Sequence, residues 1–312
     1  RMIDYAVNYS AAAASLRRQG RIQVDQFKCP AWPDVIREAQ NECPAYVHFP
    51  LRAGTGRGSP INTETGEPPD WDLFKALMDE TETPWISVHL APRPADHPEI
   101  PPQSTDPAHV ARITEAVIRD IDAVVTEFGA DRVVAENIFE YHGMHVRAAV
   151  LPEVITEVVE TTGCGLLLDI SHARLAARDL KVDPWPYIDA LPVQRIREIH
   201  VTGIQRFDAR WIQRLKRENA PQTKIDEYAG RQLDHMPMTA TDWDALSRAI
   251  ERIAAGTWAC PEIVAFEYGG IGPLFQALTV ESLLAKQVPR MYKMVHSVGE
   301  PECLNQKESI YA

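Results

Sequence analysis

Imidazoles and carboxylates recur in this chain at the ends of short apolar runs. The clearest run is GLLLDISH (165–172), in which four apolar residues precede polar ones. Such a run predicts a strand buried on both faces, with Asp169 and His172 where the strand ends. A carboxylate and an imidazole are both good ligands for a divalent metal. The spacing therefore predicts a metal-binding pair at the mouth of a buried strand.

Other apolar runs end in the same residue types. A lone histidine at a strand end is more often a hydrogen-bonded core residue than a ligand. Several carboxylates and imidazoles on one apolar rim, however, need counter-charges, because an unpaired buried charge is costly. Cations would supply that charge, so the joint pattern predicts a polynuclear metal site. In chain order the candidate ligands are His48, His89, Glu136, Asp169, His172, His200 and Glu267.

This donor set also bears on the number and kind of metal ions. It exceeds the about four to six ligands that one ion needs, so two or three ions are expected. Thiolates are absent from the set, which disfavours a closed structural zinc site. The mixture of imidazoles and carboxylates suits iron, zinc or manganese, and the residues alone do not choose between them.

Eight apolar runs alternate with segments of helical periodicity. The best helix is predicted around 110–128, where Val110, Ile113, Val117, Ile121, Val124 and Phe128 recur at helical spacing. Another helix is predicted over roughly 147–162. The alternation predicts an α/β protein with a (β/α)8 TIM barrel, in which the carboxyl ends of all strands share one rim. A doubly wound open sheet is the alternative, but the chain has neither GxGxxG nor GxxxxGK[ST]. The runs are 2–10, 22–30, 45–51, 85–92, 132–139, 165–172, 197–203 and 262–270.

Length and composition bound the domain count and the partners. A chain of 312 residues fits one barrel, so we expect a single domain over 1–297 and a mobile tail over 298–312. The net charge of −12 disfavours nucleic acid, and no apolar stretch approaches the about 20 residues that cross a membrane. The opening RMIDYAVNYS lacks a secretory pattern, and the five cysteines show no CxxC spacing. We therefore expect a cytoplasmic protein that binds neither nucleic acid nor membrane.

The motifs HF, SVHL, ENIF, LLLDISH, IHVTG and FEYGG resemble those of the xylose-isomerase-like superfamily of TIM barrels. One branch with the same ligand order is endonuclease IV, a trinuclear zinc phosphodiesterase. That resemblance implies three ions. The implied ligands are His48, His89 and Glu136 for the first ion, Glu136, Asp169, His200 and Glu267 for the second, and His172 and His235 for the third.

The closer resemblance, over about residues 130–290, is to the multinuclear non-haem iron-dependent oxidative enzymes, the family of the methanobactin-forming oxidase. The shared motifs are ENxxxY (136–141), TGCGLLLD (162–169), a DPxxYI-like segment (183–188), LPxxxxxxIH (191–200) and a late His-x-Pro (235–237). The chain departs from that family at Ser171 and His172, where Asn-Asn is common. It also has Leu233 where an Asp is usual, which leaves a ligand role for Asp234 open.

The leading hypothesis is a metal-dependent oxidoreductase that uses iron and O₂. The resemblance implies a cysteine-containing peptide or a small thiol or carboxylate as substrate, and a separate partner protein that presents the peptide. We expect Glu136, Asp169 and His200 to be catalytic. The alternatives are a zinc- or manganese-dependent phosphoesterase or sugar isomerase, and a non-enzymatic metal-binding barrel.

Substrate contacts are expected from rim-level residues and from a basic segment. Lys28 ends the second strand, and Asn137 follows Glu136. Arg206 and Arg210 belong to a segment rich in Arg and Lys before His235, which could attract an anionic substrate or could be a solvated helix face. The segment YHGMH adds two histidines, His142 and His145, of the kind common in exposed loops.

Overall fold

The computed structural model of the protein describes residues 2–140 and 143–298. The predicted mobile tail lies outside these residues except for Val298, which is buried. The chain forms two compact units, one made of residues 1–45 and 200–312 and the other of residues 46–199. It passes between them within two strands, β3 (Ala45–His48) and β9 (Ile196–Val201). The single domain predicted for 1–297 stays a prediction.

The first unit is built around β1 (Asp4–Asn8), whose central residues are fully buried. This strand pairs in parallel with β2 (Gln26–Pro30) and with β12 (Ile263–Phe266). Parallel neighbours cover both sides of β1, which explains its continuous apolar sequence. The helices of this unit's α/β part are α1 (Ala11–Arg18), α2 (Pro33–Gln40), α10 (Ala240–Ala254) and α12 (Glu281–Val295), and α12 packs against α1, α10 and β1.

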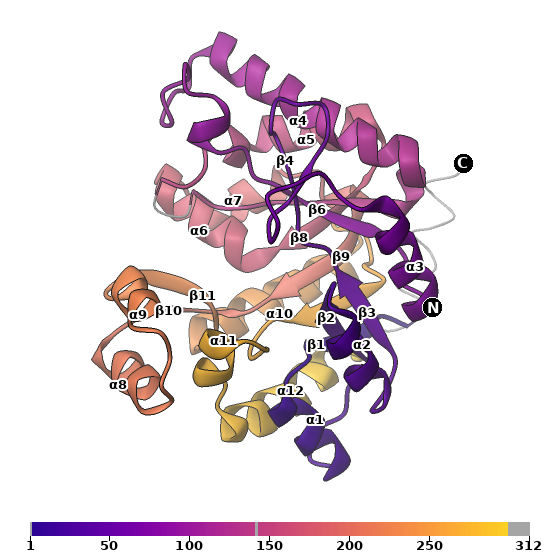
Figure 1. Ribbon diagram of the computed structural model, residues 1–312, viewed down its shortest axis with the longest axis vertical. Coiled ribbons are helices and arrows are strands. Elements are labelled where there is room, and N and C mark those ends of the chain that lie inside the picture. The colour runs from indigo at the N-terminus through magenta and orange to yellow at the C-terminus, as the bar shows by residue number, and fades with distance from the viewer. Residues whose placement is uncertain (1, 141–142, 299–312) are drawn as a thin grey trace. The chain divides into compact units, whose positions relative to one another are not determined.

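Between β9 and α10 the chain forms a small subdomain with its own core (Figure 1). Its strands β10 (Gly203–Arg206) and β11 (Gln232–Met236) are antiparallel, and α8 (Ala209–Arg217) and α9 (Gln222–Tyr228) connect them. Gly203 is required here, because a Cβ would lie 2.0 Å from the carbonyl oxygen of Pro237. The core joins Phe207, Trp211, Leu215, Ile225, Leu233 and Met236 to Ala277 and Leu278 of α11 (Pro273–Leu278).

The second unit carries a parallel sheet of β4 (Leu51–Ala53), β6 (Ile86–Leu90), β7 (Val133–Glu136) and β8 (Gly165–Asp169), with a short antiparallel strand β5 (Ile61–Asn62) at its edge. The register pairs His89 with Glu136, so two candidate ligands stand side by side where adjacent strands end. Helix α4 contacts β4, β6 and β7 (Figure 1). The unit's helices are α3 (Trp71–Thr81), α4 (Pro107–Phe128), α5 (Pro152–Thr162), α6 (Ile170–Leu180) and α7 (Pro184–Asp189), with short 3-10 turns at Pro94–Asp96, Ala130–Arg132, Arg147–Val150 and Val193–Arg195.

Prolines correct two predicted elements. The predicted third strand is divided into β3 and β4 around Pro50, which has no N–H to donate to a strand ladder. The segment 147–162 is a 3-10 turn followed by α5, because Pro152 begins the helix at its first turn. The strongest predicted helix is found as α4, capped by the Asp106 carboxylate, which accepts the N–H of Ala108 at 2.8 Å. Among the helices of the described residues, none has the length and apolarity that a membrane span requires.

Candidate metal centre

Two imidazoles converge on one carboxylate at the carboxyl ends of β3, β6 and β7. The Nε2 atoms of His48 and His89 lie 3.4 and 3.2 Å from the Oε2 atom of Glu136. The Glu136 side chain is 2% exposed, so its charge is removed from bulk water. One ligand atom from each of these three residues lies within 4.8 Å of the others. The first predicted ligand set is therefore brought together.

These separations match those of ligands around a single ion. Ligands about 2.1 Å from an ion lie about 3.0 Å apart in octahedral and about 3.4 Å apart in tetrahedral geometry. The two observed distances between the imidazole nitrogens and the Glu136 oxygen fall at these values. The donor set of two imidazoles and one carboxylate suits iron, manganese or zinc. The residues of this cluster thus fit a resident divalent ion.

The ring of His89 is held by a second contact that fixes which nitrogen faces the cluster. Its Nδ1 atom lies 3.1 Å from the carbonyl oxygen of Leu51 on the neighbouring strand β4. A carbonyl can only accept, so Nδ1 carries the proton and the lone pair is on Nε2. Carbonyl partners of this kind orient imidazole ligands in metal sites.

A second group of donors surrounds the end of β8. Asp169 is the N-cap of α6, and its Oδ1 accepts the N–H of His172 at 2.7 Å. The Nδ1 atom of His172 lies 3.6 Å from Oε1 of Glu136, but it bonds to the carbonyl oxygen of Asn137 at 2.9 Å. Because a carbonyl oxygen can only accept, the Nδ1 atom of His172 carries the proton and its Nε2 atom has the lone pair. Glu136, Asp169 and His172 form a buried group in which one ligand atom from each lies within 4.8 Å of the others, and the Nδ1 atom of His172 is 3.6 Å from an oxygen of each carboxylate.

The amide of Asn137 fastens these two strands together. Its Oδ1 accepts the N–H of Asp169 at 2.9 Å, and its Nδ2 donates to the carbonyl oxygen of the same residue at 3.0 Å. Asn137 is fully buried. These two hydrogen bonds fix the backbone of Asp169 relative to the residue that follows Glu136. Substrate contact by Asn137 stays a prediction.

In the first unit, a second cluster gathers around Glu267, which follows β12. Lys28 of β2 forms a buried ion pair with its Oε1 atom. The Nδ1 atom of His200, on β9, lies 3.3 Å from the same oxygen. The ammonium group supplies a counter-charge that a buried carboxylate requires. Lys28 was expected to contact substrate, and this pairing could not be seen in the sequence because the two residues lie 239 positions apart.

The late His-x-Pro motif also joins this cluster. His235 lies on β11 with a φ of 54°, in the left-handed region that a residue with a side chain seldom adopts. Its Nδ1 atom lies 3.1 Å from the carbonyl oxygen of Glu267, so its Nε2 atom keeps the lone pair. The Oδ2 atom of Asp234 lies 3.9 Å from the Nε2 atom of His235. The implied second and third ions draw ligands from both units and stay predictions.

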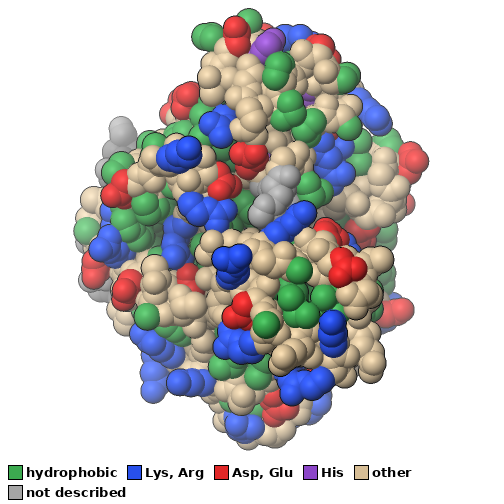
Figure 2. Space-filling model, turned by 90° about the vertical axis from the view of Figure 1, so that its left-hand side faces the viewer, with side chains coloured by type: hydrophobic (Ala, Val, Ile, Leu, Met, Phe, Trp, Pro, Cys, Tyr) green, Lys and Arg blue, Asp and Glu red, His purple; other side chains and the backbone are tan. Residues whose placement is uncertain are grey.

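The basic segment is folded into the subdomain. Trp211 and Leu215 on α8 are buried, so the segment is an amphipathic helix with a packed face. Arg206 is exposed at the end of β10, and Arg210 stacks on Trp211 and donates to Oε1 of Gln205 at 3.0 Å. Figure 2 shows the side of the molecule on which α8 and α9 lie, with Lys and Arg side chains at the surface among acidic ones. Substrate contact by either arginine stays a prediction.

The second unit also holds the buried Glu198, which the sequence did not single out, and His145, which it did. Glu198 is a buried carboxylate, but it accepts hydrogen bonds from Tyr46 Oη and Trp85 Nε1, both at 2.7 Å. His145 is partly buried rather than a simple exposed histidine, and burial lowers its pKa to about 4. His142 lies outside the described residues. Nothing in the local sequence distinguishes Glu198 or His145, because their surroundings come from distant segments.

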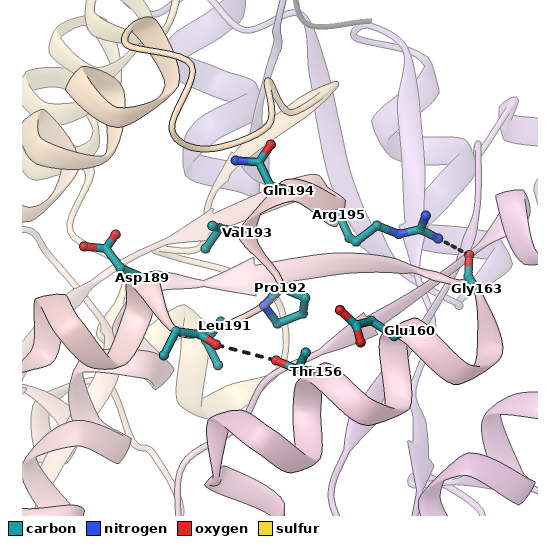
Figure 3. Close-up of a pocket in the computed structure, with 10 residues that line it drawn as sticks. Thr156, Glu160, Gly163, Asp189, Leu191, Pro192, Val193, Gln194 and Arg195 are labelled. Carbon is teal, nitrogen blue, oxygen red and sulfur yellow. Dashed lines mark hydrogen bonds between the residues drawn. The ribbon is translucent and has the colours of Figure 1, made fainter. Parts of the chain in front are cut away.

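A separate cavity of about 580 Å³ lies between α5 and the segment that joins α7 to β9 (Figure 3). Arg195 borders it and donates to the carbonyl oxygens of Gly163 and Cys164. Its lining residues precede β8 and β9, whereas Glu136 and Asp169 end their strands. The cavity is therefore distinct from the ligand cluster of this unit.

A family model described as "RiPP precursor modification enzyme MbnB/TglH/ChrH" matches residues 64–256. The chain belongs to this family. The match includes Glu136, Asp169, His200 and His235 but begins after His48. The MbnB/TglH/ChrH family is described as a family of enzymes, and the sequence predicted an enzyme.

Curated relatives of this MbnB/TglH/ChrH chain agree with the assignment. A UPF0276 protein of Caulobacter vibrioides is 32% identical over 153 residues, which are 48% of this chain and 52% of the relative. Another, from Anaeromyxobacter, is 32% identical over 138 residues, 42% of this chain and 46% of the relative. The chain thus spans about half the length of the curated relatives it matches.

A solved structure shows the fold of this family member. A xylose isomerase domain containing protein from Salmonella typhimurium superposes with a TM-score of 0.50 at 12% identity, over 94% of this chain and 97% of that one. At this identity the likeness concerns the fold alone. It confirms the predicted TIM-barrel fold.

Proposed function

We propose that this protein uses iron and O₂ to oxidise a cysteine-containing peptide precursor. The observation that carries the proposal is the convergence of the His48 and His89 Nε2 atoms on one buried oxygen of Glu136. The description of the family, modification of precursors of ribosomally made peptides, supports a peptide as substrate. A separate protein that presents this peptide remains part of the proposal.

The chain's own residues would hold the metal and keep it in place. His48, His89 and Glu136 would bind it through two imidazole nitrogens and one carboxylate oxygen. Bound iron would supply redox chemistry and a place for O₂ that side chains lack.

Neighbouring groups would fix the protonation of these ligands. The Leu51 and Asn137 carbonyl oxygens hold the protons of His89 and His172 on Nδ1, so neither ring needs to change tautomer when it binds a metal through Nε2. The burial of Glu136 excludes water from its carboxylate and strengthens its attraction to a cation. In the first unit, the Lys28 ammonium forms a buried ion pair with the Glu267 carboxylate and supplies a positive charge beside it.

The function is tested on protein purified without oxygen. Elemental analysis with Mössbauer spectroscopy should find iron, and the holoprotein should consume O₂ when a cysteine-containing peptide is added but not when serine replaces the cysteine. Glu136→Gln should lose iron and O₂ uptake, whereas Glu198→Gln, a change at another buried carboxylate of the same unit, should keep both. Bound zinc with phosphoester hydrolysis and no O₂ uptake would refute the oxidative function.

A further inference from the structure

Two arginines lie on neighbouring loops that follow β6 and β7. Arg93 comes four residues after His89 in the sequence. The N–H of Val146 donates to the carbonyl oxygen of Pro92 at 3.1 Å, and this bond brings the residues that adjoin Arg93 and Arg147 together. The two side chains therefore start from adjacent points at the same end of the second unit's sheet.

Among the described residues, neither guanidinium group has a hydrogen bond to a carboxylate. Asp96, the acid nearest in sequence to Arg93, binds the guanidinium of Arg52 through both oxygens, at 2.6 and 3.1 Å. It takes only the backbone N–H of Arg93, at 3.1 Å. Arg147 approaches Glu140 no closer than 3.8 Å, beyond hydrogen-bond distance. Within residues 2–140 and 143–298, the buried Nε atoms of both arginines have no hydrogen-bond partner.

This arrangement is costly for the positive charges. Burial lowers the pKa of Arg93 below its usual value, and the charge of Arg52 lowers it further. Asp96, which raises the pKa of Arg93, is shared with Arg52. Glu140 lies 3.8 Å from Arg147. A partly desolvated guanidinium group without a hydrogen-bonded carboxylate of its own gains free energy when an anion binds to it directly. Guanidinium groups match a carboxylate in particular, because their paired N–H groups align with its two oxygens.

His145 connects the arginines with the candidate metal centre. It stands two residues before Arg147, and its Nδ1 atom lies 3.0 Å from the carbonyl oxygen of Phe139. The ring of Phe139 in turn packs against the ring of His172, with the two ring centroids 5.3 Å apart. The loop that carries His145 and Arg147 is therefore joined through Phe139 to the candidate ligand His172. An anion held by the two arginines would lie beside the His89 side of the centre.

We propose that Arg93 and Arg147 form a carboxylate-binding subsite that positions the peptide substrate beside His89. The proposal rests on the proposed function, because that function supplies a peptide as the ligand. The carboxylate is either the carboxyl terminus of the peptide or an acidic side chain close to the reacting cysteine. Both present the same two-oxygen group to the guanidinium pair.

Binding of matched probes to the holoprotein tests the subsite by isothermal titration calorimetry without oxygen. One pair is N-acetylcysteine and N-acetylcysteinamide, and the other is the blocked dipeptides Ac-Cys-Asp-NH₂ and Ac-Cys-Asn-NH₂. We expect the acid of at least one pair to bind about tenfold more tightly than its amide, the size of a charge-assisted hydrogen bond. A preference in the first pair assigns the carboxyl terminus, and one in the second assigns a side chain. Equal binding within both pairs overturns the proposal.

Variants connect the preference to the two residues. The double variant Arg93→Gln with Arg147→Gln should bind the acid and the amide equally. The double variant Arg93→Lys with Arg147→Lys should keep part of the preference for the acid. The control is Arg132→Gln, an exposed arginine immediately before β7 and so at the opposite end of that strand from Glu136. Metal content and the thermal midpoint, measured for every variant, show that the fold and the metal centre are intact. A preference that survives in the folded double Gln variant also overturns the proposal.

The same experiment separates the subsite from the oxidative function. N-acetylalanine and N-acetylalaninamide have no thiol, so their difference in affinity reports the carboxylate alone. If this difference depends on the arginines in protein that holds no iron and takes up no O₂, the subsite stands and the oxidative function fails. If the protein oxidises the cysteine peptide but shows no preference in any pair, the function stands and the subsite fails.

Discussion

Replacing Glu136 with Gln should separate metal binding from folding. The change removes the charged oxygen that faces two imidazole nitrogens at 3.2 and 3.4 Å. Loss of a metal's outer partners alone costs about 10–100-fold in affinity, so loss of this carboxylate should cost at least about 100-fold. In metal-free protein the change should be neutral or stabilising, because a carboxylate that is 2% exposed carries a desolvation cost.

The size of the effect follows from linkage. At a metal concentration of about 100 times the dissociation constant, binding stabilises the wild-type fold by about 2.7 kcal/mol. With about 2.1 cal/mol/K per residue over 312 residues, the unfolding entropy is about 650 cal/mol/K, so the melting midpoint should rise by about 4 °C. In Glu136→Gln, with affinity about 100-fold weaker, the same metal gives about 0.4 kcal/mol and a rise below about 1 °C.

The assay is differential scanning calorimetry with and without Fe²⁺ under nitrogen, with Glu198→Gln as the control. Glu198 is equally buried, but its carboxylate accepts bonds from Tyr46 and Trp85. Glu198→Gln should lower the midpoint of the metal-free protein and keep the rise of about 4 °C on adding metal. A Glu136→Gln variant that keeps the full rise, or a Glu198→Gln variant that loses it, would refute this reasoning.

Three further predictions concern the surroundings of the centre. Asn137→Ala should lower the free energy of unfolding by about 1–3 kcal/mol for each Asp169 backbone group that it leaves without a hydrogen bond, as measured by urea unfolding. It should also weaken metal binding about 10–100-fold. An unchanged free energy of unfolding would contradict this prediction. Burial raises the pKa of Cys29 to about 12 and that of Cys43 to about 11, so iodoacetamide at pH 8 should label both only after denaturation, and mass spectrometry that finds either labelled in folded protein would exclude this. The folded-state pKa of His145 lies below its ordinary 6.5, so the free energy of unfolding should fall as pH drops from 6.5 towards 4, by up to about 1.4 kcal/mol per pH unit, and His145→Gln should flatten that slope in urea titrations.

Sequence reasoning predicted the fold class, because the fold class depends on local periodicity. Buried parallel strands have continuous apolar runs, and β8 was found from Gly165 to Asp169 as the run indicated. The ligand cluster of the second unit followed from the same rule, since strands that end at one level bring their terminal residues together. The apolar residues around Pro50 and Pro152 favoured one continuous strand and one continuous helix. The two prolines instead divide these segments in the structure.

Partner choice inside the sheet could not be predicted. The Lys28–Glu267 pair and the donors around Glu198 join residues more than 100 positions apart. The sequence around Arg93 does not distinguish it from the arginines that are common after strand ends on protein surfaces. Its significance depends on Asp96 being bound by Arg52, which only coordinates reveal.

The passage of the chain between its two units inside strands limits how the protein can be divided. A gene fragment that encodes only residues 46–199 would start one residue into β3 and stop two residues short of the end of β9. Each cut would leave backbone amides and carbonyls of a broken strand to be solvated. Recombination at these points would carry His48, His89 and Glu136 on one segment and Lys28, His200 and Glu267 on the other. An exchange of segments between relatives would therefore combine ligand clusters from different parents.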